Sequence, residues 1–316
     1  MGRYLARRLL LLVPTMLGIT LVVFLAIRFL PGNVVDQLLA DYGDVSPELR
    51  QELEERFGLR ENLPRQYLTW LGQILRGDLG ISFVSRRPVL DDLKHRLPVT
   101  VELGIIAMTA SMLIALPVGV LSAVKQDTVF DYLGRSLAVV LLAVPSFWLS
   151  LLVITYGWVL FGWTPPLRYH PPLDDLRANL QSVLPPGIIL GAVLSGSTMR
   201  LTRSSLLEVF RQDYMRTARA KGVGELTVLV RHGLRNAVLP VITVAGLQVP
   251  IIVGGTVVLE RVFSLPGMGN YLLTAVGQRD YPVVQAIVLL SATVVVLSNL
   301  LVDLTYSLLD PRIRYG

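Results

Sequence analysis

Long uncharged runs separated by charged segments dominate the pattern of apolar and polar positions along the chain. Six runs contain no Asp, Glu, Lys, Arg or His, and a membrane-spanning helix needs about 20 apolar residues. A charge at the bilayer centre costs about 2.5–3.5 kcal/mol, so the pattern predicts an all-α integral membrane protein with six transmembrane helices. The runs cover residues 9–27, 103–124, 136–167, 178–199, 236–259 and 281–302.

Two shorter amphipathic segments lie between the first and second runs. The segment "SPELRQELEERFG" starts with Ser46 as a favourable N-cap and Pro47 at the first helical position, and it ends at Gly58. The segment "RQYLTWLGQILRGD" repeats the pattern and stops at Gly77. Both predict helices in a segment outside the membrane, which either forms a small helical subdomain on the outer surface or helps to select a ligand.

The composition fits a membrane protein. Of the 316 residues 53% are hydrophobic and 16% charged, against about 25% charged residues in a typical soluble domain. The chain has no cysteine, which excludes disulfides and thiolate metal sites. Its three histidines, His95, His170 and His232, are too scattered along the chain to predict a metal cluster.

The distribution of Lys and Arg predicts the orientation. The loop over residues 200–235 holds eight basic and three acidic residues, a net charge of +5 out of +6 for the chain. Basic residues favour the cytoplasmic side, and Arg3, Arg7 and Arg8 precede the first run, while Arg312 and Arg314 follow the last. Both termini are therefore expected in the cytoplasm, with the first helix as a retained anchor because no cleavage site follows it.

Several motifs of energy-coupled or catalytic proteins are missing from the sequence. There is no G-x-x-x-x-G-K-[ST] phosphate loop and no H-E-x-x-H motif. The centres of the six runs hold no ionisable residue, whereas ion-coupled carriers usually bury one there. These absences weigh against a membrane enzyme and a secondary transporter, and they suggest that energy comes from another chain. A self-contained channel or secondary transporter is the alternative.

Small residues and prolines mark the expected helices. Gly187, Gly191 and Ser195 are spaced by four, a stripe that lets another helix approach closely. Pro117 and Pro250 each remove a backbone hydrogen bond and allow a kink. The pattern fits ordinary helix packing, or kinked helices that line a pathway and move.

The basic loop contains the segment "DYMRTARAKG". If it is helical, Tyr214, Thr217, Ala218, Lys221 and Gly222 share one nearly smooth face. The loop could be solvated, but 36 residues exceed what a connection needs. We therefore expect a docking element for a soluble partner on the cytoplasmic face.

Four segments resemble permease subunits of ATP-binding-cassette importers in the oligopeptide/dipeptide/nickel branch, and the resemblance covers essentially the whole chain. "DYMRTARAKGVGELTVLVRHGLRNAVLP" is similar to the cytoplasmic coupling loop of these subunits. "GLRENLPRQYLTWLGQILRGDLGISFVSRRPVLDDLKHRLPVTVEL" resembles their extracytoplasmic segment. "ERVFSLPGMGNYLLTAVGQRDYPVVQ" and "NLLVDLTYSLLDPRIR" resemble the last external loop and the C-terminus of the B-type permease.

The resemblance implies roles for single residues of the loop. The superfamily motif is E-A-A, three residues, then G, on a helix that docks into a cleft of the ATPase subunit. Thr217 and Ala218 match the two alanines, and Gly222 matches the glycine. Arg216 stands where the general motif has glutamate, as is common in this branch. The expected ATPase-docking residues are Tyr214, Arg216, Thr217, Ala218, Lys221 and Gly222.

The resemblance also implies the wider assembly. The expected fold is a type I importer permease, with an N-terminal anchor helix (1–30), an extracytoplasmic helical segment (31–97) and a permease core (98–316) built from the second to sixth helices. The partners would be a homologous second permease, two ATPases, an external solute-binding protein and membrane lipid, without nucleic acid. ATP and Mg²⁺ would bind to the ATPases, so this chain is non-catalytic and needs no cofactor. Peptides dominate the cargo of the branch, which also includes nickel complexes, glutathione and some sugars. The location would be the inner membrane of a prokaryote.

Overall fold

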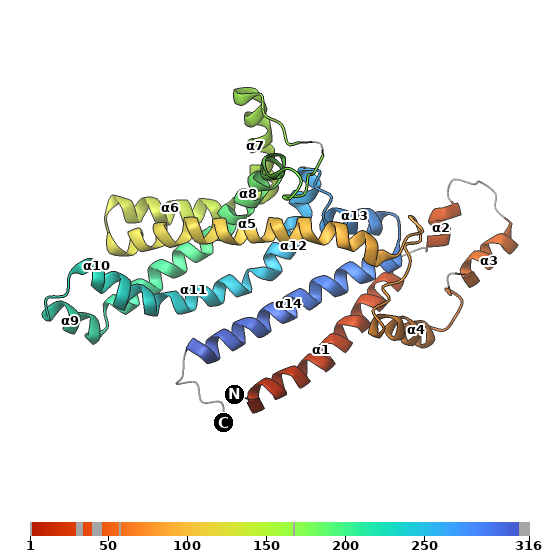
Figure 1. The fold of residues 1–316 in the computed structure, drawn as a ribbon, viewed down its shortest axis with the longest axis horizontal. Coiled ribbons are helices and arrows are strands. Elements are labelled where there is room, and N and C mark those ends of the chain that lie inside the picture. Colours follow the sequence, from red (N-terminus) through yellow and green to blue (C-terminus); the bar gives the residue numbers. More distant parts are fainter. Residues whose placement is uncertain (1, 30–33, 40–45, 57, 167, 310–316) are drawn as a thin grey trace. The chain divides into compact units, whose positions relative to one another are not determined.

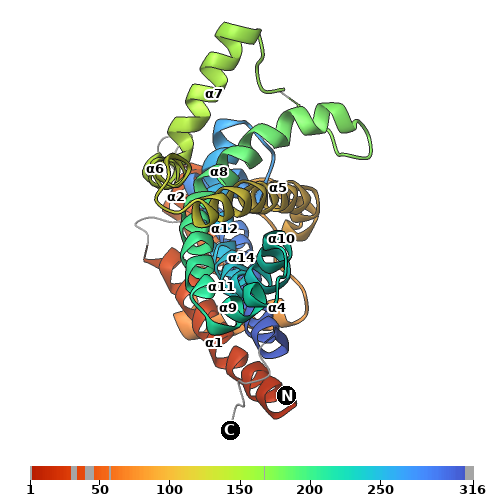
Figure 2. The same ribbon diagram turned by 90° about the vertical axis from the view of Figure 1, so that its left-hand side faces the viewer.

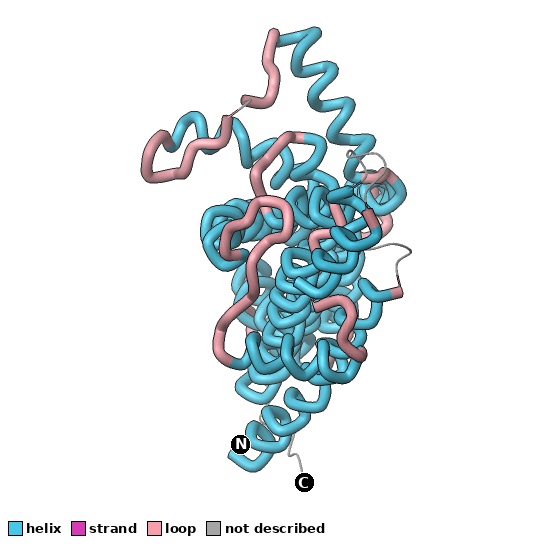
Figure 3. Tube along the Cα trace, turned by 90° about the vertical axis from the view of Figure 1, so that its right-hand side faces the viewer, coloured by secondary structure: helices cyan, strands magenta, loops and turns pink. Residues whose placement is uncertain are grey.

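The computed structural model describes residues 2–29, 34–39, 46–56, 58–166 and 168–309. These residues form helices joined by turns and loops, with no strand among them (Figure 3). The chain divides into two compact units. Unit 1 comprises Met1–Pro98 and Gly267–Val296, and unit 2 comprises Val99–Pro266 and Leu297–Gly316. Arg312 and Arg314, expected in the cytoplasm, lie outside the described residues.

Unit 1 contains short helices and the first parts of two long ones. Its core includes Val89, Leu93, Met268, Tyr281 and Ile287, all at most 5% exposed. A 2.9 Å hydrogen bond between the hydroxyl groups of Thr20 and Tyr67 joins α1 to α4. The helices are α1 (Gly2–Arg28), α2 (Val34–Leu39), α3 (Pro47–Arg56), α4 (Leu63–Leu75) and α13 (Met268–Gly277), with the N-terminal parts of α5 (Val89–Val124) and α14 (Tyr281–Leu309) (Figure 1).

Helices α3 and α4 confirm the two helices predicted between the first runs. The Ser46 Oγ accepts a hydrogen bond from the Leu49 amide at 3.3 Å, as an N-cap should. At α4 the cap is Asn62, whose side-chain oxygen accepts from the Arg65 amide at 3.2 Å. Gly58 and Gly77 follow the two helices with φ of +65° and +79°, a conformation that glycine adopts without a Cβ clash.

Unit 2 is built around the long helix α8, and the predicted stripe of small residues on this helix is confirmed as a packing surface. A Cβ added to Gly187 would lie 2.4 Å from the Ile106 side chain on α5, and one added to Gly191 would lie 2.5 Å from the carbonyl oxygen of Ala107. Only glycine permits this approach of α5 and α8. The remaining elements are α6 (Val129–Ala143), α7 (Ser146–Phe161), α8 (Leu176–Phe210), α9 (Asp213–Ala220), α10 (Glu225–Thr227), the π-helical η1 (Val228–Leu234), α11 (Arg235–Leu247) and α12 (Val249–Val262).

Three helices among the described residues are long and apolar enough to cross a membrane, and the number rises to five if each bent pair counts as one span. The three are Val89–Val124, Leu176–Phe210 and Tyr281–Val302, and the bent pairs are Val129–Ala143 with Ser146–Phe161 and Glu225–Val238 with Pro240–Leu247. Helix α1 contains a shorter apolar stretch, Leu10–Ala26.

The third expected run does not form one continuous helix. It is divided between α6 and α7, which meet at 99° (Figure 2). Pro145 lies at the break and cannot donate the hydrogen bond that would continue α6, and it disfavours helical backbone at the residue before it. Val144 accordingly adopts φ −83° and ψ 121°, an extended conformation.

Candidate docking surface on the loop between α8 and α11

The loop between α8 and α11 contains a short helix with defined ends. Helix α9 carries Asp213 in its first turn and Arg219 in its last, which suits the helix dipole at both ends. Gly222 follows with φ +76°. Its amide donates to the Arg219 carbonyl at 2.9 Å, and the Val223 amide donates to the Ala218 carbonyl at 3.3 Å. The glycine therefore terminates α9, since these bonds close the last turn around a left-handed residue.

One side of α9 is buried against the same chain. Met215 is fully buried and Ala218 is 8% exposed. Both pack in a cluster with Val228 of η1, alongside Phe210 at the end of α8. Ala218, one of the predicted docking residues, is therefore buried within the loop. The reason is the spacing of three between Met215 and Ala218, which places both on one side of the helix.

The other predicted docking residues are exposed. Arg216, Thr217 and Lys221 lie on the surface, and Tyr214 is 41% exposed. The Thr217 hydroxyl donates to the Asp213 carbonyl at 3.0 Å. Five of the six predicted residues, Gly222 included, thus remain accessible to a partner, while Ala218 supports them from beneath.

Contacts with neighbouring elements fix the orientation of α9. The Tyr214 hydroxyl accepts a hydrogen bond from the Asn236 side chain on α11 at 3.0 Å. The Arg219 guanidinium donates to both carboxylate oxygens of Glu225 at 3.0 and 3.4 Å. These contacts tie the loop to α10 and α11.

Sequence reasoning missed two of the residues that shape this site. Met215 is the main buried anchor of α9, and its spacing of three from Ala218 was the signal that could have revealed it. Glu225 forms an ion pair with Arg219, six positions earlier in the chain. Helical periodicity does not predict a contact at that spacing.

A groove of about 510 Å³ lies beside the loop. Its lining combines apolar side chains with Arg211, Arg219 and Glu225. Leu226 is 75% exposed at this groove, so an apolar side chain is available for a partner to cover. The lining residues are Ala123, Val124, Gln126, Leu207, Phe210, Arg211, Arg219, Glu225, Leu226 and Leu229.

The loop is carried by two helices that pack closely together, α8 and α11 (Figure 1). Leu206 of α8 and Ala237 of α11 lie in one buried cluster. Farther from the loop, the Gln248 amide nitrogen donates to the Leu194 carbonyl at 3.0 Å and to the Thr198 hydroxyl at 2.9 Å. Gln248 is 2% exposed, so a buried polar contact joins the far end of α11 to α8.

An ion pair holds α6 to α8 near the same end of the unit. Arg203 binds both oxygens of Asp131 at 2.7 Å. The Asp131 side chain is fully buried and the Arg203 side chain is 21% exposed. Two parallel bonds of this kind give a defined geometry as well as energy.

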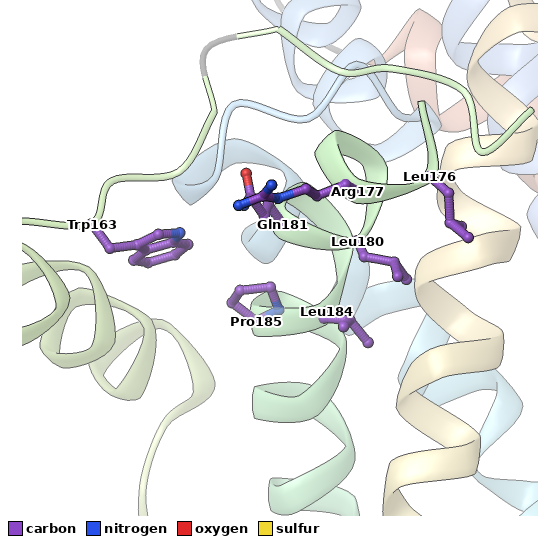
Figure 4. A pocket seen from close by; sticks show the side chains of 7 residues that line it. All are labelled: Trp163, Leu176, Arg177, Leu180, Gln181, Leu184 and Pro185. Atoms are coloured by element: carbon purple, nitrogen blue, oxygen red, sulfur yellow. The ribbon is translucent and has the colours of Figure 1, made fainter. Parts of the chain in front are cut away.

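A second groove, of about 590 Å³, lies where the segment after α7 meets α8. Trp163 faces Arg177 and Gln181 across it (Figure 4). Leu176, Leu180, Leu184 and Pro185 complete the lining. Nearby, burial together with a hydrogen bond to Glu102 raises the pKa of Tyr169 to about 12, so this tyrosine stays neutral at physiological pH.

The docking surface has the chemistry of a binding site. Its exposed groups are cations, a phenol, a hydroxyl and an apolar side chain. Within the described part of the chain, no three His, Cys, Asp or Glu side chains gather where they could hold a metal ion. The arrangement can bind a complementary surface, and its contacts join it to α8 and α11.

Comparisons with known proteins cover the whole chain. The family described as "Binding-protein-dependent transport system inner membrane component" matches residues 115–315. The family described as "Binding-prot-dependent transport system membrane comp, N-term" matches residues 1–104.

Two relatives align over nearly their full length. The chain is 40% identical over 339 residues to the dipeptide transport system permease protein DppB of Escherichia coli strain K12, covering 100% of this chain and 99% of that protein. It is 39% identical over 321 residues to the oligopeptide transport system permease protein AppB of Bacillus subtilis strain 168, covering 100% of both. A crystal structure of an amino acid ABC transporter with histidines aligns with a TM-score of 0.48 and 16% identity, over 77% of this chain and 98% of that one.

Proposed function

Because this chain belongs to the family of binding-protein-dependent transport system inner membrane components, we propose that it is the permease subunit of an ATP-driven importer of peptides. A permease of this family is a multi-pass, non-catalytic subunit of the inner membrane, and nucleotide binds to its ATPase partners. Two relatives of about 40% identity are named as dipeptide and oligopeptide permeases and match from end to end. That length of similarity supports peptides as the cargo.

The observation that supports a docking role is that α9 has one side buried against its own chain and the other side exposed. Met215 and Ala218 secure the helix to its own chain, so a partner need not supply the energy to order it. Tyr214, Thr217 and Lys221 are left on the surface. A helix already held in place binds with a smaller loss of conformational entropy than a flexible loop. We therefore assign the ATPase-docking surface to Tyr214, Arg216, Thr217, Lys221 and Gly222, with Ala218 as a support.

We propose the following topology. The six spans would be α1, α5, α6 with α7, α8, α11 with α12, and α14, with both termini in the cytoplasm. Residues 1–30 would form the anchor helix, 31–97 the extracytoplasmic segment and 98–316 the core, with spans two to six as the type I arrangement. The excess of basic residues over 200–235 supports this orientation.

The partners follow from this arrangement. A homologous second permease would complete the pathway, two ATPases would dock on the two coupling loops, and an extracytoplasmic binding protein would deliver the peptide. Closure of the ATPases on ATP would displace α9. Helices α8 and α11 would carry the displacement to the spans, since they pack on each other from the loop to Gln248.

Reconstitution tests the proposal. The chain is placed in liposomes with its second permease and ATPases, and uptake of a labelled dipeptide is measured with the binding protein outside. We expect uptake that requires ATP inside the liposome and the binding protein outside. Uptake by this chain alone, without nucleotide, would refute the importer and support a self-contained transporter.

The orientation has its own test, helped by the absence of native cysteine. A cysteine at Arg216 should resist a membrane-impermeant thiol reagent in intact cells but react with it in inside-out vesicles stripped of the ATPases, and a cysteine at Glu52 should react in intact cells. Both native side chains lie on the surface, so a difference in labelling reports the side of the membrane. The opposite result would invert the topology and remove the docking role of α9.

A further inference from the structure

Residues 80–89 of unit 1 form a tight turn that is closed by backbone hydrogen bonds. The Ser82 amide donates to the Arg87 carbonyl at 2.9 Å, and the Val89 amide donates to the Gly80 carbonyl at 3.0 Å. Ile81 and Pro88 form an antiparallel bridge. The two sides of the turn are therefore held together by backbone hydrogen bonds, as in a short hairpin.

A buried carboxylate holds the turn from beneath. Asp280, at the start of α14, is 2% exposed. It accepts hydrogen bonds from the Ser82 hydroxyl and from the amides of Phe83, at 3.1 Å, and Val84, at 3.4 Å. A buried carboxylate is tolerated only when such donors compensate for its lost hydration. Asp280 thus fixes the conformation of three consecutive residues.

An aromatic side chain adds a second anchor. Phe83 packs on the core of unit 1 and meets the Tyr281 ring edge to face at 6.3 Å between centroids. Its neighbours Val84 and Ser85 point to the surface. The turn is therefore bound on one side by Phe83 and Asp280 and exposed on the other.

The exposed tip is cationic. Arg86 and Arg87 are adjacent and both on the surface. Arg86 has φ +58°, a strained value for a residue with a side chain, and such strain persists only where the surroundings enforce it. Three cations elsewhere in unit 1 have carboxylate partners, in the pairs Arg50–Asp36, Arg60–Glu55 and Lys94–Asp91. Within the described residues the guanidinium of Arg87 has no such partner.

The tip lies well before the apolar part of α5. That helix begins at Val89, and its last charged residue before the uncharged run of 103–124 is Glu102. The intervening fourteen residues span about 21 Å of helix at 1.5 Å per residue. Lipid headgroups occupy a layer of only about 5–8 Å beside the hydrocarbon core, so a protein surface fits this position better than a lipid.

We propose that the tip formed by Val84, Ser85, Arg86 and Arg87 is a contact surface for an acidic patch on the extracytoplasmic solute-binding protein. This inference rests on the proposed function, which supplies that partner. Arginine suits the role because its planar guanidinium binds carboxylates through two parallel hydrogen bonds. Unlike a flexible loop, a tip fixed by Asp280 loses little conformational freedom on binding.

The test uses the complete transporter in lipid nanodiscs and its purified binding protein. The double variant Arg86→Glu with Arg87→Glu should bind the binding protein about tenfold more weakly or worse, because two attractive contacts become repulsive. The loss should appear mainly in the association rate, and added salt should reduce the difference from the wild type. Arg76→Glu is the matched control, since Arg76 is an exposed cation of the same unit outside the turn.

A second variant tests the anchor separately. Asp280→Asn removes the charge that the three donors bind but keeps a similar shape. It should weaken the same association while leaving the charge of the tip unchanged. Its effect should not depend on salt in the way that charge reversal does, which separates positioning from electrostatics.

The outcomes distinguish this inference from the proposed function. If the wild-type transporter shows no affinity for the binding protein, the proposed function fails. If the wild type binds and the double variant binds equally well, the contact surface is refuted. A double variant that binds normally but loses association with anionic lipid vesicles would show that the tip contacts lipid, which also overturns the inference.

Discussion

Replacing Gly222 in turn by alanine, asparagine and leucine would separate two reasons for a glycine at the end of α9. The first is conformational, because Gly222 has φ +76°. The second is steric, because the docking hypothesis places this residue close to the ATPase. The two reasons predict different orders of effect among the three variants.

The structure sets the size of the conformational effect. A Cβ added at Gly222 meets no atom of the described chain within 4 Å, so the substitutions cause no clash within the chain. A left-handed conformation costs a residue with a side chain about 1–2 kcal/mol, and less for asparagine. At about 1.4 kcal/mol per factor of ten, alanine and leucine should weaken ATPase binding about 5- to 30-fold. Asparagine should weaken it less, giving an affinity between those of the wild type and the alanine variant. Overpacking against a partner would instead make the loss grow with side-chain volume, by about 1–3 kcal/mol for the largest.

The assay is the affinity of the purified permease complex for its ATPase subunits, measured together with transport. Gly224→Ala is the control, because Gly224 has φ −60° and open space at its Cβ. If the loss of ATPase affinity is smallest for asparagine and equally large for alanine and leucine, the conformational reason holds. If the loss instead increases from alanine through asparagine to leucine, Gly222 lies in close contact with the ATPase. If all three variants bind and transport like the wild type, neither reason holds and α9 is not the docking helix.

Three further predictions concern the packing of unit 2. Gly191→Ala places a Cβ 2.5 Å from a backbone oxygen and should destabilise the protein by about 1–3 kcal/mol. Gly254→Ala is the control, because its Cβ meets open space. Thermal unfolding in detergent should show a lower midpoint for Gly191→Ala alone. Arg203→Met leaves the buried Asp131 without its cation and should cost about 3 kcal/mol, measured in the same way; an unchanged midpoint would contradict this. Gln248→Met removes the amide bonds to α8 at similar volume and should lower transport per ATP hydrolysed, and an unchanged ratio would show that this contact does not couple the helices.

Periodicity and end signals determined the local structure well. Ser46 and Gly58 bounded α3 as expected, because a cap and a left-handed glycine act through backbone bonds within one turn. The stripe of Gly187 and Gly191 likewise predicted a close helix approach. These features could be read from the sequence because each depends on residues a few positions apart.

The docking surface was only partly predictable. The helix over Asp213–Ala220 followed from the sequence, while the docking role of Gly222 stays a prediction. Which side of that helix faces outward depends on Val228 and Phe210, which come from two neighbouring elements. A helix of eight residues has no apolar stripe long enough to determine its own orientation, so the burial of Ala218 did not follow from the sequence.

Contacts between residues distant in sequence belonged to the tertiary structure alone. Asp280 binds the turn at Ser82 across 198 positions, and Asp131 binds Arg203 across 72. The sequence determined that this chain is helical, apolar and basic on one loop, since these properties follow from composition and local periodicity. The partners of its buried polar groups were decided by the tertiary structure. A buried carboxylate needs hydrogen-bond donors close to it in space, and the spacing of residues along the chain does not predict which donors these will be.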